Sequence, residues 1–117
     1  MRIRRVGGAV VIAETAAMID AATHRFLTQL REFDRIGGWH TAGAQSCAHW
    51  LSWRVGMDLG AAREKVRVAR ALEGLPAIDE ALRGGEISYS KVRAMTRVAN
   101  AGNEEMLLMM ARQTTGS

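Results

Sequence analysis

The sequence predicts an all-α protein built as a single helical domain. Its 117 residues are enough for one modest core, and 48% of them are hydrophobic. Alanine, leucine and arginine, which favour helices, are abundant, whereas proline occurs once, at Pro76. Apolar residues recur at three- and four-residue steps, and no segment alternates as a strand does. We therefore expect about six helices with a helix-turn-helix-like centre.

The first 14 residues are expected to form a loose leader. The stretch "MRIRRVGGAVVIAE" places three arginines before a short apolar run, which resembles a secretion signal only weakly. Glu14 ends that run, and no small-residue cleavage pattern follows. No apolar run approaches the roughly 18 residues that a membrane span needs. We expect a leader over 1–14, a helical domain over 15–113, a tail over 114–117, and no membrane contact.

The first helix is predicted between Thr15 and Ile36, and Gly37 and Gly38 supply its stop. Its apolar face is expected to lie against the domain and its polar face to lie in solvent. The "WHTAGAQ" stretch that follows is expected to be a loop. The apolar face consists of Met18, Ile19, Ala22, Phe26, Leu30 and Phe33, and the other side carries mainly Asp20, Arg31, Glu32, Asp34 and Arg35.

Local start and stop residues mark the next three helices. Ser46 caps "CAHWLSWRVG", in which Gly56 is the stop. Asp58 caps "LGAAREKVRVARALEGL". Pro76 occupies the first turn of "PAIDEALRGG", where its missing N–H costs nothing, and the two glycines end that helix.

The last helix, "EEMLLMMARQ", begins at Asn100 or Asn103 and carries apolar side chains that need cover. Two explanations stay open. Either these side chains close the core of this domain, or a further segment or a second subunit covers them. The side chains are Met106, Leu107, Met109 and Met110.

The sequence offers little chemistry for catalysis. Cys47 is the only cysteine, which excludes an internal disulfide and suits a reducing cytoplasm. We expect it to be a small buried residue rather than a thiol of lowered pKa. A zinc site from His40, Cys47 and His49 is the alternative, although the paired ligand spacing usual for zinc is missing. No phosphate-binding glycine loop is present. We expect no enzyme activity, no cofactor and no metal.

Other polar residues have structural explanations. His24 lies on a polar stretch of the first helix. Two pairs of carboxylates, at residues 79–80 and 104–105, fall in the first turns of helices, where negative charge favours the helix dipole. We therefore assign no chemistry to them.

Two of the predicted helices carry arginines one turn apart. The net charge of +4 and the pI of about 10.2 permit an anionic partner without identifying one. The helix after Asp58 has three arginines in a stripe beside an apolar arc. The helix after Ser88, "YSKVRAMTRVA", has two, opposite an inward face of Val92, Met95 and Val98. These arginines are Arg63, Arg67, Arg70, Arg93 and Arg97.

Guanidinium groups spaced in this way suit nucleic acid, because they can reach successive phosphates or guanine edges. Gly56 lies where helix-turn-helix units bend, so the first stripe falls on the helix that would enter the major groove. The segment that follows resembles, in shape, the one after the recognition helix of plasmid-partition proteins. We predict duplex DNA as a partner. The alternative is a solvated charged face, with Glu64 and Glu73 nearby.

A longer resemblance covers residues from about Met18 to Arg112. It is carried by "GW", "SCAHWLSWRVGMD", "AREKVRVARAL", "LP", "GEISYSKVRAMTRVA" and "NEEMLLMMAR". These motifs resemble domain of unknown function 222 of the actinobacterial 13E12-type repeat proteins. In that family the domain commonly precedes an HNH nuclease module, so the resemblance implies a helical domain attached to DNA chemistry. The residues of an HNH module are absent from this sequence, and nuclease activity is not carried over.

The leading hypothesis is a non-catalytic DNA-binding or DNA-targeting accessory module. The alternative is a helical interaction domain that docks an HNH nuclease partner, or a second copy of itself. That docking would use Met106, Leu107, Met109 and Met110. A further alternative is a shortened family member without independent function.

Overall fold

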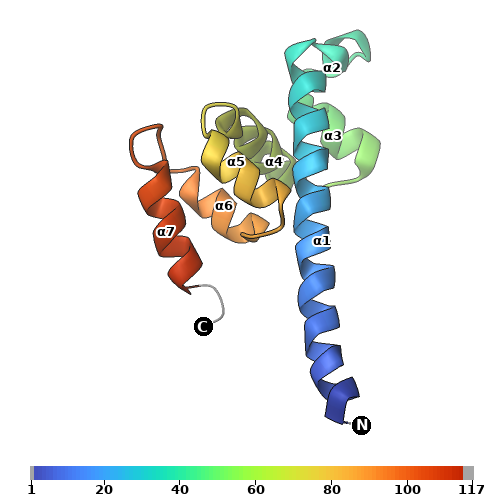
Figure 1. Cartoon of the computed structure of the whole chain (residues 1–117). Helices are drawn as coiled ribbons and strands as arrows, with labels where there is room; N and C mark the ends of the chain where they lie inside the picture. Colours follow the sequence, from blue (N-terminus) through green and yellow to red (C-terminus); the bar gives the residue numbers. More distant parts are fainter. Residues whose placement is uncertain (1, 115–117) are drawn as a thin grey trace.

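Seven α-helices make up the computed structural model, and the described residues contain no strand. The structure describes the backbone of residues 2–114 and the side chains of residues 8–113. The all-α prediction is confirmed, with one helix more than expected. The helices are α1 (Arg2–Arg35), α2 (Gly38–Thr41), α3 (Cys47–Val55), α4 (Leu59–Leu72), α5 (Pro76–Arg83), α6 (Tyr89–Met95) and α7 (Glu104–Thr114) (Figure 1).

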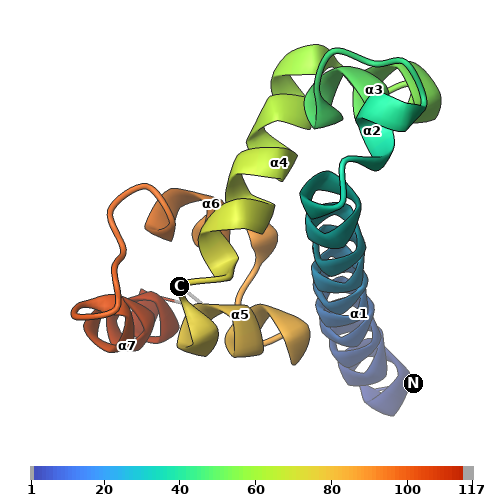
Figure 2. The same ribbon diagram turned by 90° about the horizontal axis from the view of Figure 1, so that it is seen from above.

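The central helix is α4, which contacts α1, α3, α5 and α6. Figure 2 shows it running between the α2–α3 end of the molecule and the group formed by α5, α6 and α7. Two buried clusters meet along it, and α4 contributes buried residues to both. The first cluster holds Leu30, Cys47, Ala48, Leu51, Ala62 and Val66. The second holds Leu27, Val68, Ala69, Leu72, Leu75, Ile78, Ala81, Leu82, Ile87, Val92, Met95 and Leu108.

The predicted helix starts and stops are confirmed at the centre of the chain. Ser46, Asp58 and Ser88 each accept hydrogen bonds from backbone N–H groups in the first turn of the helix that follows. Gly56 ends α3 with φ at 80°, a conformation that glycine adopts without steric cost. Pro76 lies in the first turn of α5. Local chemistry is therefore sufficient to place these boundaries.

Residues 2–14 are helical, and the expectation of a loose leader is wrong there. α1 begins at Arg2 rather than near Thr15. No proline interrupts this stretch, and each residue that extends an existing helix adds one hydrogen bond. The N-terminal part of α1 projects from the body of the molecule (Figure 1). Of the predicted tail, Thr114 ends α7, and residues 115–117 lie outside the described residues.

The face of α1 that packs on the domain agrees with the predicted one only in part: Leu30 is buried, and Phe26 and Phe33 pack against the core clusters. Met18 and Ile19 are 69% and 62% exposed, whereas His24 and Leu27 are buried. His24 Nε2 lies 3.0 Å from the carboxylate of Asp79 on α5. Polar groups on the same side of α1 as His24 form hydrogen bonds with α4 and α6. Because polar groups near the core need partners, these contacts hold that side against the domain in preference to the side of Met18 and Ile19. These contacts join Asp20 to the Tyr89 N–H, Arg31 to the Ala69 carbonyl, and Asp34 to Arg70.

Two further boundaries differ from the prediction. α2 forms within the expected loop, after Gly37 turns the chain at φ 73°. α6 ends at Met95, and Val98 is 65% exposed instead of facing inward. The N–H groups of Arg97 and Val98 bond three residues back rather than four, which rotates Val98 away from the core.

The apolar side chains of α7 divide between the core and the surface. Leu108 is buried and Leu107 is partly buried, so they close the second core cluster. Met106, Met109 and Met110 are more than half exposed. The explanation that these side chains close the core therefore holds for Leu107 and not for the three methionines, for which cover by a further segment or a second subunit stays a prediction. No helix in the described part of the chain has the length and apolar character to cross a membrane.

Candidate nucleic-acid interface

Two separate groups of arginines in the sequence come together in the structure at Glu64 of α4. The Glu64 carboxylate accepts hydrogen bonds from Arg67 at 2.6 Å, Arg93 at 3.2 Å and Arg97 at 2.8 Å. Arg67 also donates to the backbone carbonyl of Arg93 at 3.2 Å. α4 and α6 are therefore joined through their charged side chains as well as their apolar ones. We call the five predicted residues, Arg63, Arg67, Arg70, Arg93 and Arg97, the arginine cluster.

The remaining two members of the arginine cluster lie further along α4. Arg70 donates to both carboxylate oxygens of Asp34 on α1, at 2.6 Å and 3.0 Å. Arg63 is exposed, and no carboxylate of the described residues lies within ion-pair distance of it. Arg63, Arg67 and Arg70 line one side of an open recess whose other side is the start of α3. An anion approaching α4 would thus meet three guanidinium groups in a row.

Glu64 is held in its ionised form by the arginines around it. Its pKa falls from the usual 4.5 to about 2, chiefly because Arg67 donates a hydrogen bond to the carboxylate. The hydrogen bond from Arg93 and the positive charges of Arg67 and Arg97 lower the pKa further, against the effect of burial. Glu64 therefore remains a fixed anion at neutral pH and orients three cations.

The arginine cluster keeps a positive surplus after its ion pairs are made. Four of its five guanidinium groups share two carboxylates, those of Glu64 and Asp34, and the fifth, that of Arg63, pairs with neither. The side chains of Arg70, Arg93 and Arg97 are 63%, 51% and 54% exposed. Because each guanidinium group has five N–H donors, these side chains keep donors for a further anion.

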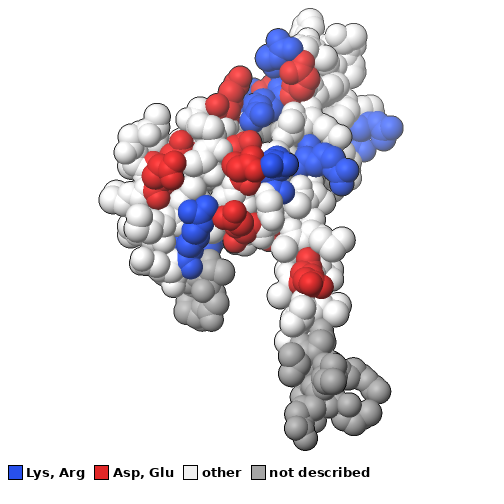
Figure 3. All heavy atoms as spheres, in the orientation of Figure 1, with Lys and Arg blue, Asp and Glu red and all other residues white. Residues whose placement is uncertain are grey.

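On the face drawn in Figure 3, basic and acidic side chains lie side by side over the body of the domain. Next to the arginine cluster, Lys65 Nζ lies 4.5 Å from the centre of the Tyr89 ring. Burial, and then the charge of Arg93, lowers the pKa of Lys65. The surface that brings the arginine cluster together thus consists of α4, α6 and the turn after α6.

The cysteine prediction is confirmed, and the zinc alternative finds no support. Cys47 is 1% exposed, and its burial raises the pKa of the thiol to about 11. His49 uses its Nδ1 for a 2.8 Å contact with the hydroxyl of Ser46. His40, Cys47 and His49 do not gather as ligands, and the described side chains contain no group of three or more His, Cys, Asp or Glu suited to a metal ion.

Two carboxylates cap helices other than their own, which the sequence did not reveal. The buried Glu104 of α7 accepts hydrogen bonds from the N–H groups of Ala77 and Ile78 in the first turn of α5, at 3.0 Å and 3.1 Å. Asp20 of α1 accepts one from the Tyr89 N–H at the start of α6, at 3.0 Å. Because the residue before α5 is a leucine without a capping group, an acceptor from elsewhere was required.

Among the comparisons with known proteins, the one with family models finds a match. The family model described as "Domain of unknown function (DUF222)" matches residues 9–115. No curated protein and no solved structure matches the chain. The matched range holds the whole arginine cluster, and it confirms the resemblance found in the sequence motifs.

Proposed function

We propose that this chain, which belongs to the DUF222 family, is a non-catalytic module that binds duplex DNA through its arginine cluster. The observation that carries the proposal is the meeting of three guanidinium groups, from α4, α6 and the turn after α6, at Glu64, with the two further arginines of the cluster on the same helix α4. Guanidinium groups form strong paired hydrogen bonds with phosphate oxygens. Glu64 holds three of them ready, so little side-chain freedom is lost when phosphate binds.

The arginine cluster is suited to phosphates more than to base edges. α4 buries Ala62, Val66, Val68, Ala69 and Leu72 against its neighbours, so only a narrow strip of its surface is open. Contacts from such a strip fix a protein on the DNA backbone without reading the sequence. We therefore assign phosphate contacts to all five arginines. We place this target in the cytoplasm, because a chain whose one cysteine is buried and free suits a reducing compartment.

Nuclear magnetic resonance of the Arg side chains tests this proposal. Addition of a short duplex should shift the Nε–Hε signals of the arginine cluster. Arg35 and Arg83 serve as controls, because they form ion pairs with Glu32 and Glu80 outside the cluster. Shifts confined to these two residues, or no shifts at low salt, would refute the assignment.

The exposed side of α7 favours a second candidate function, docking of an HNH nuclease module. Met106, Met109 and Met110 are 56%, 59% and 55% exposed, and methionine adapts well to irregular apolar partners. Calorimetric titration with an HNH module of a family member tests this function. We expect binding that Met109→Asp abolishes, while Glu105→Gln on the same helix leaves it intact. Absence of heat with the unchanged chain would contradict it.

A further inference from the structure

The N-terminal half of α1 presents an apolar face that nothing in the described structure covers. Ile12 and Ile19 are 72% and 62% exposed, and no atom lies within 4 Å of a Cβ built on Gly8. Apart from one acidic group, the described part of this projecting segment displays uncharged side chains in Figure 3. Exposed apolar surface of this extent usually marks an interaction site.

The apolar face follows a seven-residue repeat. Ile12, Ile19, Phe26 and Phe33 occupy one position of the repeat, and such spacing is typical of helices that pair along their length. A second position, three residues after the first, carries Thr15, Ala22 and Gln29, with Gly8 one repeat earlier. His24, Leu27 and Arg31 meet the domain on the opposite side of α1, whereas Phe26 and Phe33 are partly buried against the core clusters and keep only part of each ring open. We call the eight residues of these two positions the α1 stripe.

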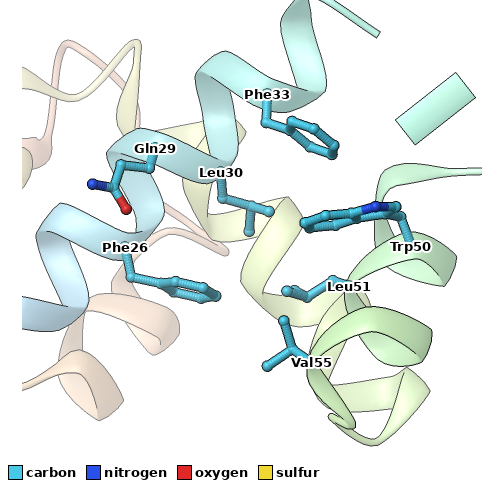
Figure 4. A pocket seen from close by; sticks show the side chains of 7 residues that line it. All are labelled: Phe26, Gln29, Leu30, Phe33, Trp50, Leu51 and Val55. Carbon is cyan, nitrogen blue, oxygen red and sulfur yellow. The ribbon is translucent and has the colours of Figure 1, made fainter. Parts of the chain in front are cut away.

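An open apolar groove continues the α1 stripe at the C-terminal half of the helix. Figure 4 shows Phe26, Leu30 and Phe33 of α1 pointing toward Trp50, Leu51 and Val55 of α3, while Gln29 points away. The rings of Phe33 and Trp50 lie 4.3 Å apart and form the end of the groove. The groove therefore lies beside α1, where a second helix packing along the α1 stripe would meet it.

We propose that α1 pairs in antiparallel orientation with α1 of a second copy of this chain. The projecting segment of each copy, residues 8–19, would then lie along the groove of the other. The two helices would overlap over residues 8–33, about 39 Å at 1.5 Å per residue. Each copy contributes the same projecting segment and the same groove, so the interface closes on itself with two-fold symmetry.

The sizes of the side chains in the α1 stripe favour antiparallel pairing with a second copy of this chain. The first position of the α1 stripe carries large side chains, and the second carries smaller or flexible ones. In an antiparallel pair the first position faces the second, so large side chains meet small ones and fill the space. A parallel pair would set phenylalanine against phenylalanine and leave voids beside the small residues. The antiparallel contacts are Phe33 with Gly8, Phe26 with Thr15, Ile19 with Ala22, and Ile12 with Gln29 of the second copy.

Sedimentation equilibrium of the full chain tests the pairing. We expect a species of twice the 12.8 kDa chain mass. Ile12→Asp should raise the dissociation constant at least about a hundredfold, because the charge would be buried at two symmetric places. Val10→Asp is the matched control, since Val10 lies on the same turn, is 48% exposed and falls outside the α1 stripe. Helix content of both variants, measured by circular dichroism, should equal that of the unchanged chain.

A monomer at all concentrations would overturn the proposal, as would a dimer that Ile12→Asp leaves intact. Spin labels at Val10→Cys then test the orientation, because Cys47 is buried and escapes labelling. Antiparallel pairing places the two labels about 32 Å apart along the helix axis. A separation within about 20 Å, as expected for parallel helices of 10–12 Å diameter, would overturn the arrangement.

Discussion

The carboxylate of Glu64 on α4 accepts a 2.8 Å hydrogen bond from the guanidinium group of Arg97, which follows the last turn of α6. The same carboxylate accepts hydrogen bonds from Arg67 and Arg93. One anion thus holds three cations from two helices in a single surface. Without this carboxylate, the arginines of α4 and those of α6 would form two separate charged surfaces.

Glu64 should titrate far below an ordinary glutamate. We expect a pKa of about 2, and Arg67→Gln should raise it toward 4.5, because Arg67 provides the largest of the lowering contributions. The depressed value means that ionised Glu64 stabilises the fold above pH 4.5, and that this contribution is lost as the pH falls toward 2. Carbon-detected magnetic resonance of the carboxyl group measures the pKa. Arg83→Gln, which is remote from Glu64, should leave it unchanged.

Removing the charge of Glu64 should strengthen DNA binding. In the free protein Glu64 orders three guanidinium groups but also occupies donors that phosphate would use. Because glutamine keeps an oxygen that can order the arginines but removes the negative charge, Glu64→Gln should raise the affinity about three- to tenfold at low salt. Glu80→Gln is the matched control, because Glu80 also pairs with an arginine three residues along the same helix, outside the arginine cluster. Fluorescence anisotropy measures both. Weaker binding by Glu64→Gln would speak against competition between carboxylate and phosphate.

Glu104 should matter for stability through α5 rather than through its own helix. Its carboxylate is 5% exposed and accepts two hydrogen bonds from the first turn of α5. Glu104→Ala should lower the free energy of unfolding by about 1–3 kcal/mol, because two N–H groups lose their acceptor. The exposed neighbour Glu105 is the control, and Glu105→Ala should change it by less than about 0.5 kcal/mol. Urea unfolding gives both values, and equal losses would refute the capping role.

The orientation of α1 can be tested in the same way. Leu27 is 1% exposed and packs in the core, so Leu27→Ala should lower the free energy of unfolding by about 2–5 kcal/mol. Met18 belongs to the face that the sequence predicted as buried, yet it is 69% exposed. Met18→Ala should cost less than about 1 kcal/mol. A larger loss for Met18→Ala than for Leu27→Ala would restore the predicted face.

The helix boundaries at the centre of the chain could be predicted because their causes are local. Ser46, Asp58 and Ser88 bond to N–H groups two or three residues away, and Gly56 turns the chain by its own conformation. Each of these effects depends on residues that are neighbours in the sequence. The three arginines of α4 could be placed for the same reason, since helical spacing alone puts them on one face of that helix.

What could not be predicted depends on contacts between distant parts of the chain. Glu64 and Arg97 are 33 residues apart in the sequence. Glu104 is 26 residues from Ile78, whose N–H donates a hydrogen bond to its carboxylate. α1 carries both a polar and an apolar face, and only the position of α4, α5 and α6 decides which one packs. The pair formed by the buried His24 and the partly buried Asp79 shows the same dependence, because neither residue signals its contact by itself.

The most direct test of the central claim is the salt dependence of DNA binding. Fluorescence anisotropy with a labelled duplex should be measured at several salt concentrations for the unchanged chain and for Arg→Gln variants. The variants are those at Arg63, Arg67, Arg70, Arg93 and Arg97, with Arg83→Gln as the control.

Because each neutralised phosphate releases counterions, log affinity should fall with log salt by about 0.9 per contact. Each variant of the arginine cluster should flatten that slope by up to about one unit, while Arg83→Gln preserves it. Absence of binding at low salt, or a slope that none of the five substitutions changes, would contradict the account.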